Sequence, residues 1–163
     1  TGAKAPTLYA EFVNKEGLFR AVLDRYISRF AAKHEALLFD DQKTVDQALR
    51  DYFTAVATCF TSKDTPAGCF MINTSAALAA SSTDIANTIK SRHAVQEQTL
   101  TQFLQQRQQR GELPAQGNVL QLAQFLNCVL QGMSISAREG ADFATLKQIS
   151  DTTLRLWPQI LQP

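Results

Sequence analysis

The chain has 163 residues, of which 45% are hydrophobic, 9% aromatic and 19% charged. This length suits one folded domain, or one domain with a small addition, and excludes two large domains; the composition excludes a disordered tail. The net charge of +1 says nothing about nucleic acid. Residues 1–34, however, hold six Lys or Arg against three Asp or Glu, so the N-terminal end is the cationic end.

The apolar runs are too short to cross a membrane, because a spanning helix needs roughly 20 consecutive apolar residues. The three cysteines, Cys59, Cys69 and Cys128, are odd in number and lie in helical patterns, which argues against a secreted disulfide framework. We therefore expect a cytoplasmic protein with free thiols and no membrane partner.

Apolar residues recur at spacings of three and four along the chain, and most glycines and prolines stand where this pattern breaks, so an all-α fold is predicted. A short helix over 4–12 precedes a long one over 14–38, and a capping box at Thr44 begins a third over 44–61. A buried helix is expected over 69–78, and a helix with a half-apolar inner face runs from 81–83 to Gly111. Two final helices begin at Asn118 and Asp142 and end near Gly140 and before Pro158.

The first 17 residues are the most informative. Pro6 suits the first turn of a helix, on which Leu8 and Phe12 would face inward while Lys4, Thr7 and Tyr9 face outward. Such a short helix is marginal by itself and needs neighbours to hold it.

The motifs Pro6-Thr-Leu-Tyr9, Phe12 and Asn14-Lys-Glu-Gly-Leu-Phe19 resemble the helix-turn-helix signature of the TetR/AcrR family of transcriptional repressors. The resemblance implies that residues 1–17 are the turn and recognition helix of a DNA-binding domain whose first two helices precede this sequence. It implies that residues 18–163 form a helical ligand-binding and dimerisation domain. Matched position by position, the residues facing DNA bases or phosphates would be Lys4, Ala5, Pro6, Thr7, Tyr9 and Lys15; Ala10 and Glu11 depart from the pattern of the family.

The same resemblance implies a homodimer that binds a palindromic operator and is released by a small inducer, with no cofactor required. The two last helices would form the dimer interface, through Leu126, Leu130, Ile135, Leu146, Ile149, Thr153 and Leu156. An enzyme is not expected, because the chain has no Gly-rich phosphate loop, HExxH motif, Cys-x-x-Cys pair or nucleophile elbow.

Polar or sulfur-bearing residues interrupt the inner faces of the predicted helices and suggest a ligand pocket, because a buried polar group is costly unless it is paired. These candidates are Cys69, Asn73, His93, Gln96, Cys128 and Met133. Cys69, Met71 and Cys128 offer the soft sulfur donors that Cu(I) prefers, and the runs 61–73 and 132–140 resemble a copper-responsive member of the family. Three alternatives stay open: a repressor that senses electrophiles or oxidants, a ligand- or metal-binding protein without DNA function, and a helical transferase.

Overall fold

The structure is a computed structural model that describes residues 5–78 and 82–161, and all its regular elements there are helices. The chain divides into two compact units, residues 1–33 and residues 34–163. The division expected after Gly17 therefore differs from the structural one, because the helix after Gly17 packs with the helix before it and belongs to the same unit. We call the first unit the reading unit and the second the body.

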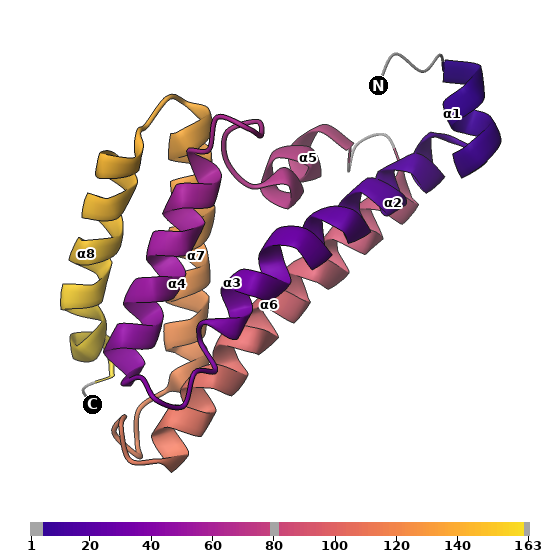
Figure 1. Ribbon diagram of the computed structural model, residues 1–163. Coiled ribbons are helices and arrows are strands. Elements are labelled where there is room, and N and C mark those ends of the chain that lie inside the picture. Colours follow the sequence, from indigo (N-terminus) through magenta and orange to yellow (C-terminus); the bar gives the residue numbers. More distant parts are fainter. Residues whose placement is uncertain (1–4, 79–81, 162–163) are drawn as a thin grey trace. The chain divides into compact units, whose positions relative to one another are not determined.

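Among its described residues, the reading unit contains two α-helices, a π-helical turn and the start of a third α-helix (Figure 1). Helix α1 spans Ala5–Phe12 and α2 spans Lys15–Tyr26. The helix predicted over 14–38 is interrupted by a π-helical turn, η1, at Ile27–Ala31, before α3 continues it over Ala32–Ala36. A π turn accommodates one extra residue in a helix, which a pattern of apolar spacings does not reveal.

The body contains the remaining predicted helices at nearly the predicted bounds: α4, Val45–Phe60; α5, Phe70–Leu78; α6, Thr83–Gln109; α7, Val119–Arg138; and α8, Phe143–Ile160. The capping box is confirmed, since Gln47 N donates to Thr44 Oγ1 over 3.3 Å and Thr44 N to Gln47 Oε1 over 3.0 Å. The predicted end before Pro158 is wrong. Helix α8 includes Pro158 in its last turn and ends at Ile160.

The core of the body lies between α4, α7 and α8, with α6 packed along α7 (Figure 1). Each helix contributes a stripe at spacings of three and four, and the largest fully buried side chains are Phe53, Phe103, Leu38, Leu49, Leu100, Leu104, Leu122, Leu126, Leu130, Met133 and Leu146. Helix α5 is less buried than predicted: Met71 is in the core, whereas Phe70, Ile72 and Thr74 are partly exposed. The described helices include none that is both long and apolar enough to cross a membrane.

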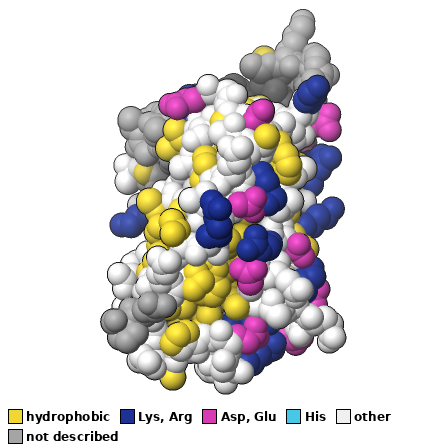
Figure 2. Space-filling model, turned by 90° about the vertical axis from the view of Figure 1, so that its left-hand side faces the viewer, with side chains coloured by type: hydrophobic (Ala, Val, Ile, Leu, Met, Phe, Trp, Pro, Cys, Tyr) yellow, Lys and Arg dark blue, Asp and Glu magenta, His cyan; other side chains and the backbone are white. Residues whose placement is uncertain are grey.

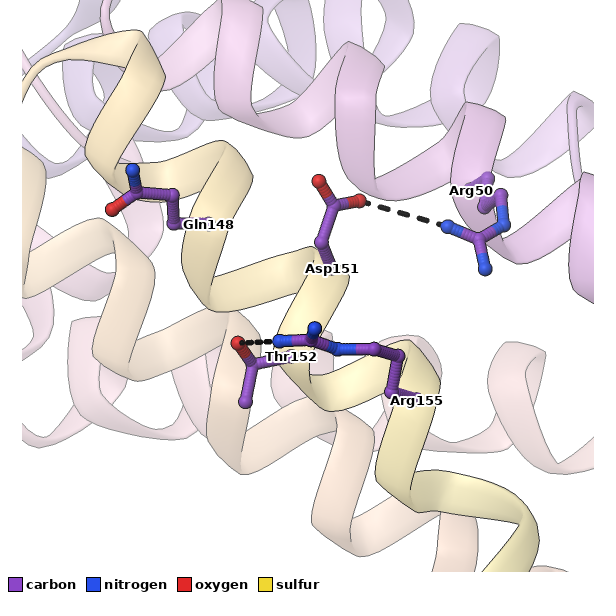
Figure 3. Close-up of a pocket in the computed structure, with 5 residues that line it drawn as sticks. All are labelled: Arg50, Gln148, Asp151, Thr152 and Arg155. Atoms are coloured by element: carbon purple, nitrogen blue, oxygen red, sulfur yellow. Dashed lines mark hydrogen bonds and ion pairs between the residues drawn. The ribbon is translucent and has the colours of Figure 1, made fainter.

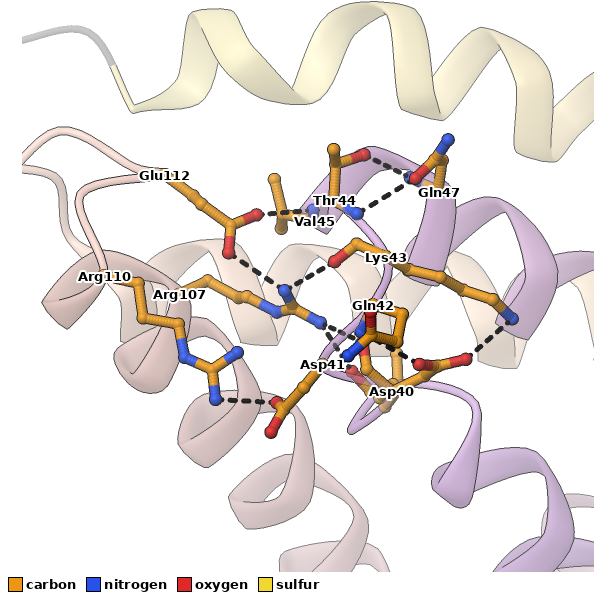
Figure 4. A network of polar contacts seen from close by, with 11 residues as sticks. Asp40, Asp41, Gln42, Lys43, Thr44, Val45, Gln47, Arg107, Arg110 and Glu112 are labelled. Atoms are coloured by element: carbon orange, nitrogen blue, oxygen red, sulfur yellow. Dashed lines mark hydrogen bonds and ion pairs between the residues drawn. The ribbon is translucent and has the colours of Figure 1, made fainter.

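A buried arginine joins the start of the body to α6 (Figure 4). The Arg107 side chain is 3% exposed; its Nη1 donates to Lys43 O over 2.7 Å and to Glu112 Oε1 over 2.9 Å, and its Nη2 donates to Asp40 O over 2.9 Å. Partial burial raises the pKa of Glu112, but the hydrogen bonds from Arg107 and Val45 N prevail and hold it below its usual value. The loop 38–43 is thus fixed to α6 by charge-assisted bonds.

Candidate nucleic-acid interface and ligand pocket

Helix α1 presents the short side chains of Pro6, Thr7 and Ala10 to solvent, and the longer, acidic Glu11 is also exposed. Lys15, predicted to contact a phosphate, is exposed at the first position of α2. Ala5 and Tyr9 lie in α1, but their side chains, like that of Leu8, are outside the description, and Lys4 lies outside the described residues altogether. A helix of this kind can enter a major groove, where short side chains allow close approach to base edges.

The turn between α1 and α2 is closely fitted. Asn14 caps α2 by accepting a 2.8 Å hydrogen bond from Gly17 N, and Asn14 N donates to Phe12 O over 2.7 Å. A Cβ atom at Gly17 would lie 2.1 Å from Phe12 O, so only glycine allows this approach of the two helices. Val13 has a φ of 66°, an unusual and strained value for a β-branched residue. The turn fixes the angle of α1 to α2.

The reading unit also carries exposed positive charge. Lys15, Arg20, Arg25, Arg29 and Lys33 are all exposed along α2, η1 and α3. Such a series can contact phosphates, which supply position and much of the affinity in DNA binding but no base specificity.

The residues predicted to form one ligand pocket lie in different environments. Cys69 and Met133 are buried, Asn73, His93 and Gln96 are partly exposed, and Cys128 is exposed on α7, which excludes it from an enclosed pocket. Asn73 has a structural role, since its Nδ2 donates to Ala67 O over 2.8 Å. Cys69 N likewise donates to Ser134 Oγ over 2.7 Å and anchors the start of α5 to α7.

A polar group that the sequence did not reveal lies on the inner face of α4. Tyr52 is 3% exposed, and its hydroxyl pairs with the side chain of Gln96 on α6. Burial raises the pKa of Tyr52 strongly because the phenolate would lose its hydration. Tyr52 lies at a spacing of three from Leu49 and four from Val56, as an apolar core residue would, so its polar role depends on Gln96, which is distant in sequence.

Two thiols lie in the same part of the body. Cys59 is partly exposed near the end of α4, and Gly68 N donates to Phe60 O over 2.9 Å, which brings Cys69 back beside that end. Burial and then the neighbouring Cys69 raise the pKa of the Cys59 thiol. Within the described part of the chain, no group of three or more His, Cys, Asp or Glu side chains could hold a metal ion.

Surface grooves lie between helices in the described part of the body. One, of about 510 Å³, lies between α4 and α8 and is lined by charged and polar side chains (Figure 3). Arg50 Nη1 lies 3.6 Å from Asp151 Oδ1 there, and Lys147 also pairs with Asp151. Another groove, of about 460 Å³, follows the seam of α6 and α7 and includes His93. The structure thus places His93 at a surface groove and Gln96 against Tyr52.

Four of the seven side chains expected at a dimer interface are core residues of the single subunit. Leu126, Leu130, Leu146 and Thr153 are at most 6% exposed, because they fill the space between α4, α7 and α8. Ile135 and Leu156 are 50% and 48% exposed. Ile149 is partly exposed, and a Cβ at Gly132 would meet nothing within 4 Å. Figure 2 shows the side of the molecule on which α8 lies, where apolar side chains gather below a band of charged ones.

Comparison with known proteins agrees with this architecture. Residues 46–151 match the family model described as the tetracyclin repressor-like C-terminal domain. The chain is 70% identical over 162 residues to the HTH-type transcriptional repressor ComR of Escherichia coli (strain K12), covering 99% of this chain and 77% of ComR. It is 29% identical over 140 residues to the HTH-type transcriptional repressor BdcR of the same organism, covering 85% of this chain and 65% of BdcR.

Solved structures show the same fold. A cysteine mutant of the TetR family regulator CifR, complexed with a 26-base-pair operator DNA, superposes with a TM-score of 0.84 at 24% identity over 95% of this chain and 81% of CifR. A TetR regulator from Rhodococcus sp. RHA1 gives a TM-score of 0.69 at 27% identity over 96% of this chain and 83% of its own. These relatives are transcription regulators, not enzymes. The chain belongs to the TetR family of transcriptional repressors.

Proposed function

We propose that this repressor reads a palindromic operator with α1, as a homodimer, and that a small inducer bound in the body lowers its affinity for DNA. The observation that carries the proposal is the turn at Gly17, which holds α1 against α2 so that Pro6 and Thr7 face outward. The operator DNA bound to the CifR mutant of the same fold supports this mode of binding.

The homodimer would form through the outer face of α7 and α8. Ile135 and Leu156 supply exposed apolar surface on these helices, and Gly132 leaves room for a second helix to approach closely. A two-fold symmetric dimer would carry two copies of α1, and the symmetry of such a dimer is mirrored in a palindromic site.

The test is DNA binding by the protein expressed with its natural N-terminal sequence. An operator is first selected from a random DNA library, and affinity is then measured by fluorescence anisotropy over a range of salt concentrations. Thr7→Ala and Lys15→Ala should each weaken binding by about 1–3 kcal/mol, and Lys15→Ala should also reduce the dependence on salt.

Lys63→Ala is the matched control, because Lys63 is an exposed lysine in the loop between α4 and α5 of the body. Its affinity for the operator should equal that of the parent protein. Equal losses in all three variants, or none, would refute α1 as the reading helix.

Copper is the inducer that we propose first. The thiols of Cys59 and Cys69 lie in the same part of the body and Met71 is buried nearby in α5, so two thiols and one thioether are available, and Cu(I) favours such soft donors. Cys128, a metal candidate in the sequence, is exposed on α7 and would not contribute.

Titration with Cu(I) under anaerobic conditions, with operator binding as the readout, tests this assignment. Release should be lost in Cys69→Ser and retained in Cys128→Ser. Release by Cu(I) that survives Cys69→Ser would refute the site, and operator binding indifferent to Cu(I) would refute copper as the inducer while leaving the reading helix intact.

A further inference from the structure

The groove on the seam of α6 and α7 has a polar lining from both helices. His93, Ala94, Glu97, Gln98 and Thr101 come from α6, and Leu120, Asn127 and Gln131 come from α7. Its volume of about 460 Å³ lies within the range of small-molecule sites and is far larger than a single ion needs.

Two of these side chains have polar atoms that lack any hydrogen-bond partner. Asn127 is 7% exposed, and its Oδ1 is a buried acceptor without a donor. The Nε2 atom of His93 is also buried and has no hydrogen-bond partner. Leaving such an atom unpaired is unfavourable, so a ligand that supplies the missing hydrogen-bond partner regains free energy.

The spacing of the lining residues brings their side chains to one place. His93 and Glu97 are four residues apart on α6, and Asn127 and Gln131 are four residues apart on α7, so each pair lies on one face of its helix. Thr101 Oγ1 donates to the backbone carbonyl of Glu97 over 2.8 Å, and Glu97 lines the groove. Glu97 thus lines the groove together with two residues whose unpaired polar atoms, His93 Nε2 and Asn127 Oδ1, are buried.

The charge of the groove sets the charge of a ligand. No lysine or arginine is among its lining residues, and Glu97 is the one acidic residue there. Burial lowers the pKa of His93, so its imidazole is neutral at neutral pH and can accept a hydrogen bond at one ring nitrogen. Ala94 and Leu120 supply apolar surface beside these acceptors.

We propose that this groove binds a small organic cation, such as an amidinium or a primary amine with a short apolar body. Its N–H groups donate to the Glu97 carboxylate and to Asn127 Oδ1, which a small rotation of the amide exposes, and its apolar part lies against Ala94 and Leu120. The site is separate from the thiols, and binding is measured on the chain itself, so it does not depend on operator recognition.

The experiment uses benzamidine as the probe and benzamide as its neutral counterpart, with binding measured by calorimetry and by NMR of the α6 and α7 amides. Benzamidine should bind at least about tenfold more tightly than benzamide, since a charge-assisted hydrogen bond contributes about 1.5–3 kcal/mol. Glu97→Gln should remove this preference. Glu139→Gln, at the exposed C-cap of α7, is the matched control and should leave it unchanged.

Asn127→Leu tests whether affinity for benzamidine can be lost without a loss of folding stability. This change removes an unpaired buried amide oxygen, so thermal stability should be retained or increased while affinity for benzamidine falls about tenfold. Equal affinity for benzamidine and benzamide, unchanged binding in Glu97→Gln, or no binding at millimolar concentration would overturn the proposal. Chemical shifts at the groove that depend on protein concentration rather than on benzamidine would overturn it in favour of a second copy of the chain.

Discussion

Different interactions stabilise the reading unit and the body. Among the described residues, the reading unit buries only two apolar side chains, Phe19 and Leu23, and its geometry depends on a cap at Asn14 and a close approach at Gly17. The body has a continuous core through four helices and a buried arginine that binds three carbonyls and a carboxylate. Backbone fit therefore dominates in the unit that would contact DNA, and side-chain packing dominates in the unit that would bind inducer and partner.

Truncating the core should give the largest effect on stability. Phe53 is fully buried in α4, and Phe53→Ala should lower the free energy of unfolding by about 3–5 kcal/mol, because it leaves a cavity. Urea unfolding followed by circular dichroism measures this loss. Phe39→Ala, at a residue 38% exposed, should cost clearly less; equal losses would contradict the central role of the α4 core.

Breaking the buried network should cost somewhat less. Arg107→Met leaves three carbonyl oxygens and Glu112 Oε1 without the donor that Arg107 provides, so we expect a loss of about 3 kcal/mol in the same unfolding experiment. Arg110→Met is the control, since the Arg110–Asp41 pair is largely exposed and such pairs contribute about 1 kcal/mol or less. Indistinguishable losses would show that burial of Arg107 does not matter.

Gly17→Ala should destabilise the reading unit and leave the stability of the body unchanged. The added methyl group would lie 2.1 Å from Phe12 O, so the α1–α2 turn must open at a cost of about 1–3 kcal/mol, whereas the body is untouched. Hydrogen exchange should show lost protection in α1 and α2 only, and operator affinity should fall about tenfold or more. Ala21→Ser, an exposed change on α2, serves as control. Protection lost throughout the body would contradict independent units.

Relieving backbone strain at Val13 should stabilise the reading unit, whereas Gly17→Ala destabilises it. Asparagine tolerates a positive φ better than a β-branched residue does, so Val13→Asn should stabilise the reading unit by about 0.5–1 kcal/mol. Val22→Asn makes the same change at an exposed position inside α2 and should not stabilise. Hydrogen-exchange rates of the α1 and α2 amides provide the measurement. Slower exchange in Val22→Asn but not in Val13→Asn would contradict the claim that Val13 is strained.

The smallest expected effect is on the pH dependence of folding stability. Burial lowers the folded-state pKa of His93 below 6.5, so below this pH the unfolded chain binds more protons and stability falls as pH drops toward the folded-state pKa. His93→Gln should therefore show a weaker fall between about pH 7 and pH 5. Burial raises the pKa of Glu35, which acts in the opposite sense, but equally in both proteins. If stability changes with pH by the same amount in the parent protein and in His93→Gln, then His93 is as hydrated in the folded chain as in the unfolded chain.

Helix periodicity and capping residues were enough to predict the helices, because each stripe and cap is local in sequence. Thr44, Asn118 and Asp142 all cap the helices expected from them. The separation of inward-facing from outward-facing residues on α7 and α8 could not be predicted, because both faces carry apolar side chains: Leu126 is buried and Ile135 is exposed. The Tyr52–Gln96 pair and the unpaired Asn127 also depend on how distant helices pack, which no local pattern encodes.

The π turn at 27–31 affects how the long helix tolerates length changes. Such a turn holds one residue more than an α-helical turn, so deleting one residue there would restore regular α-helical winding. The same deletion within α2 would shift all later side chains by about 100° around the axis, given 3.6 residues per turn. The segment 27–31 is thus the place where this helix can gain or lose a residue while its two ends keep their phase.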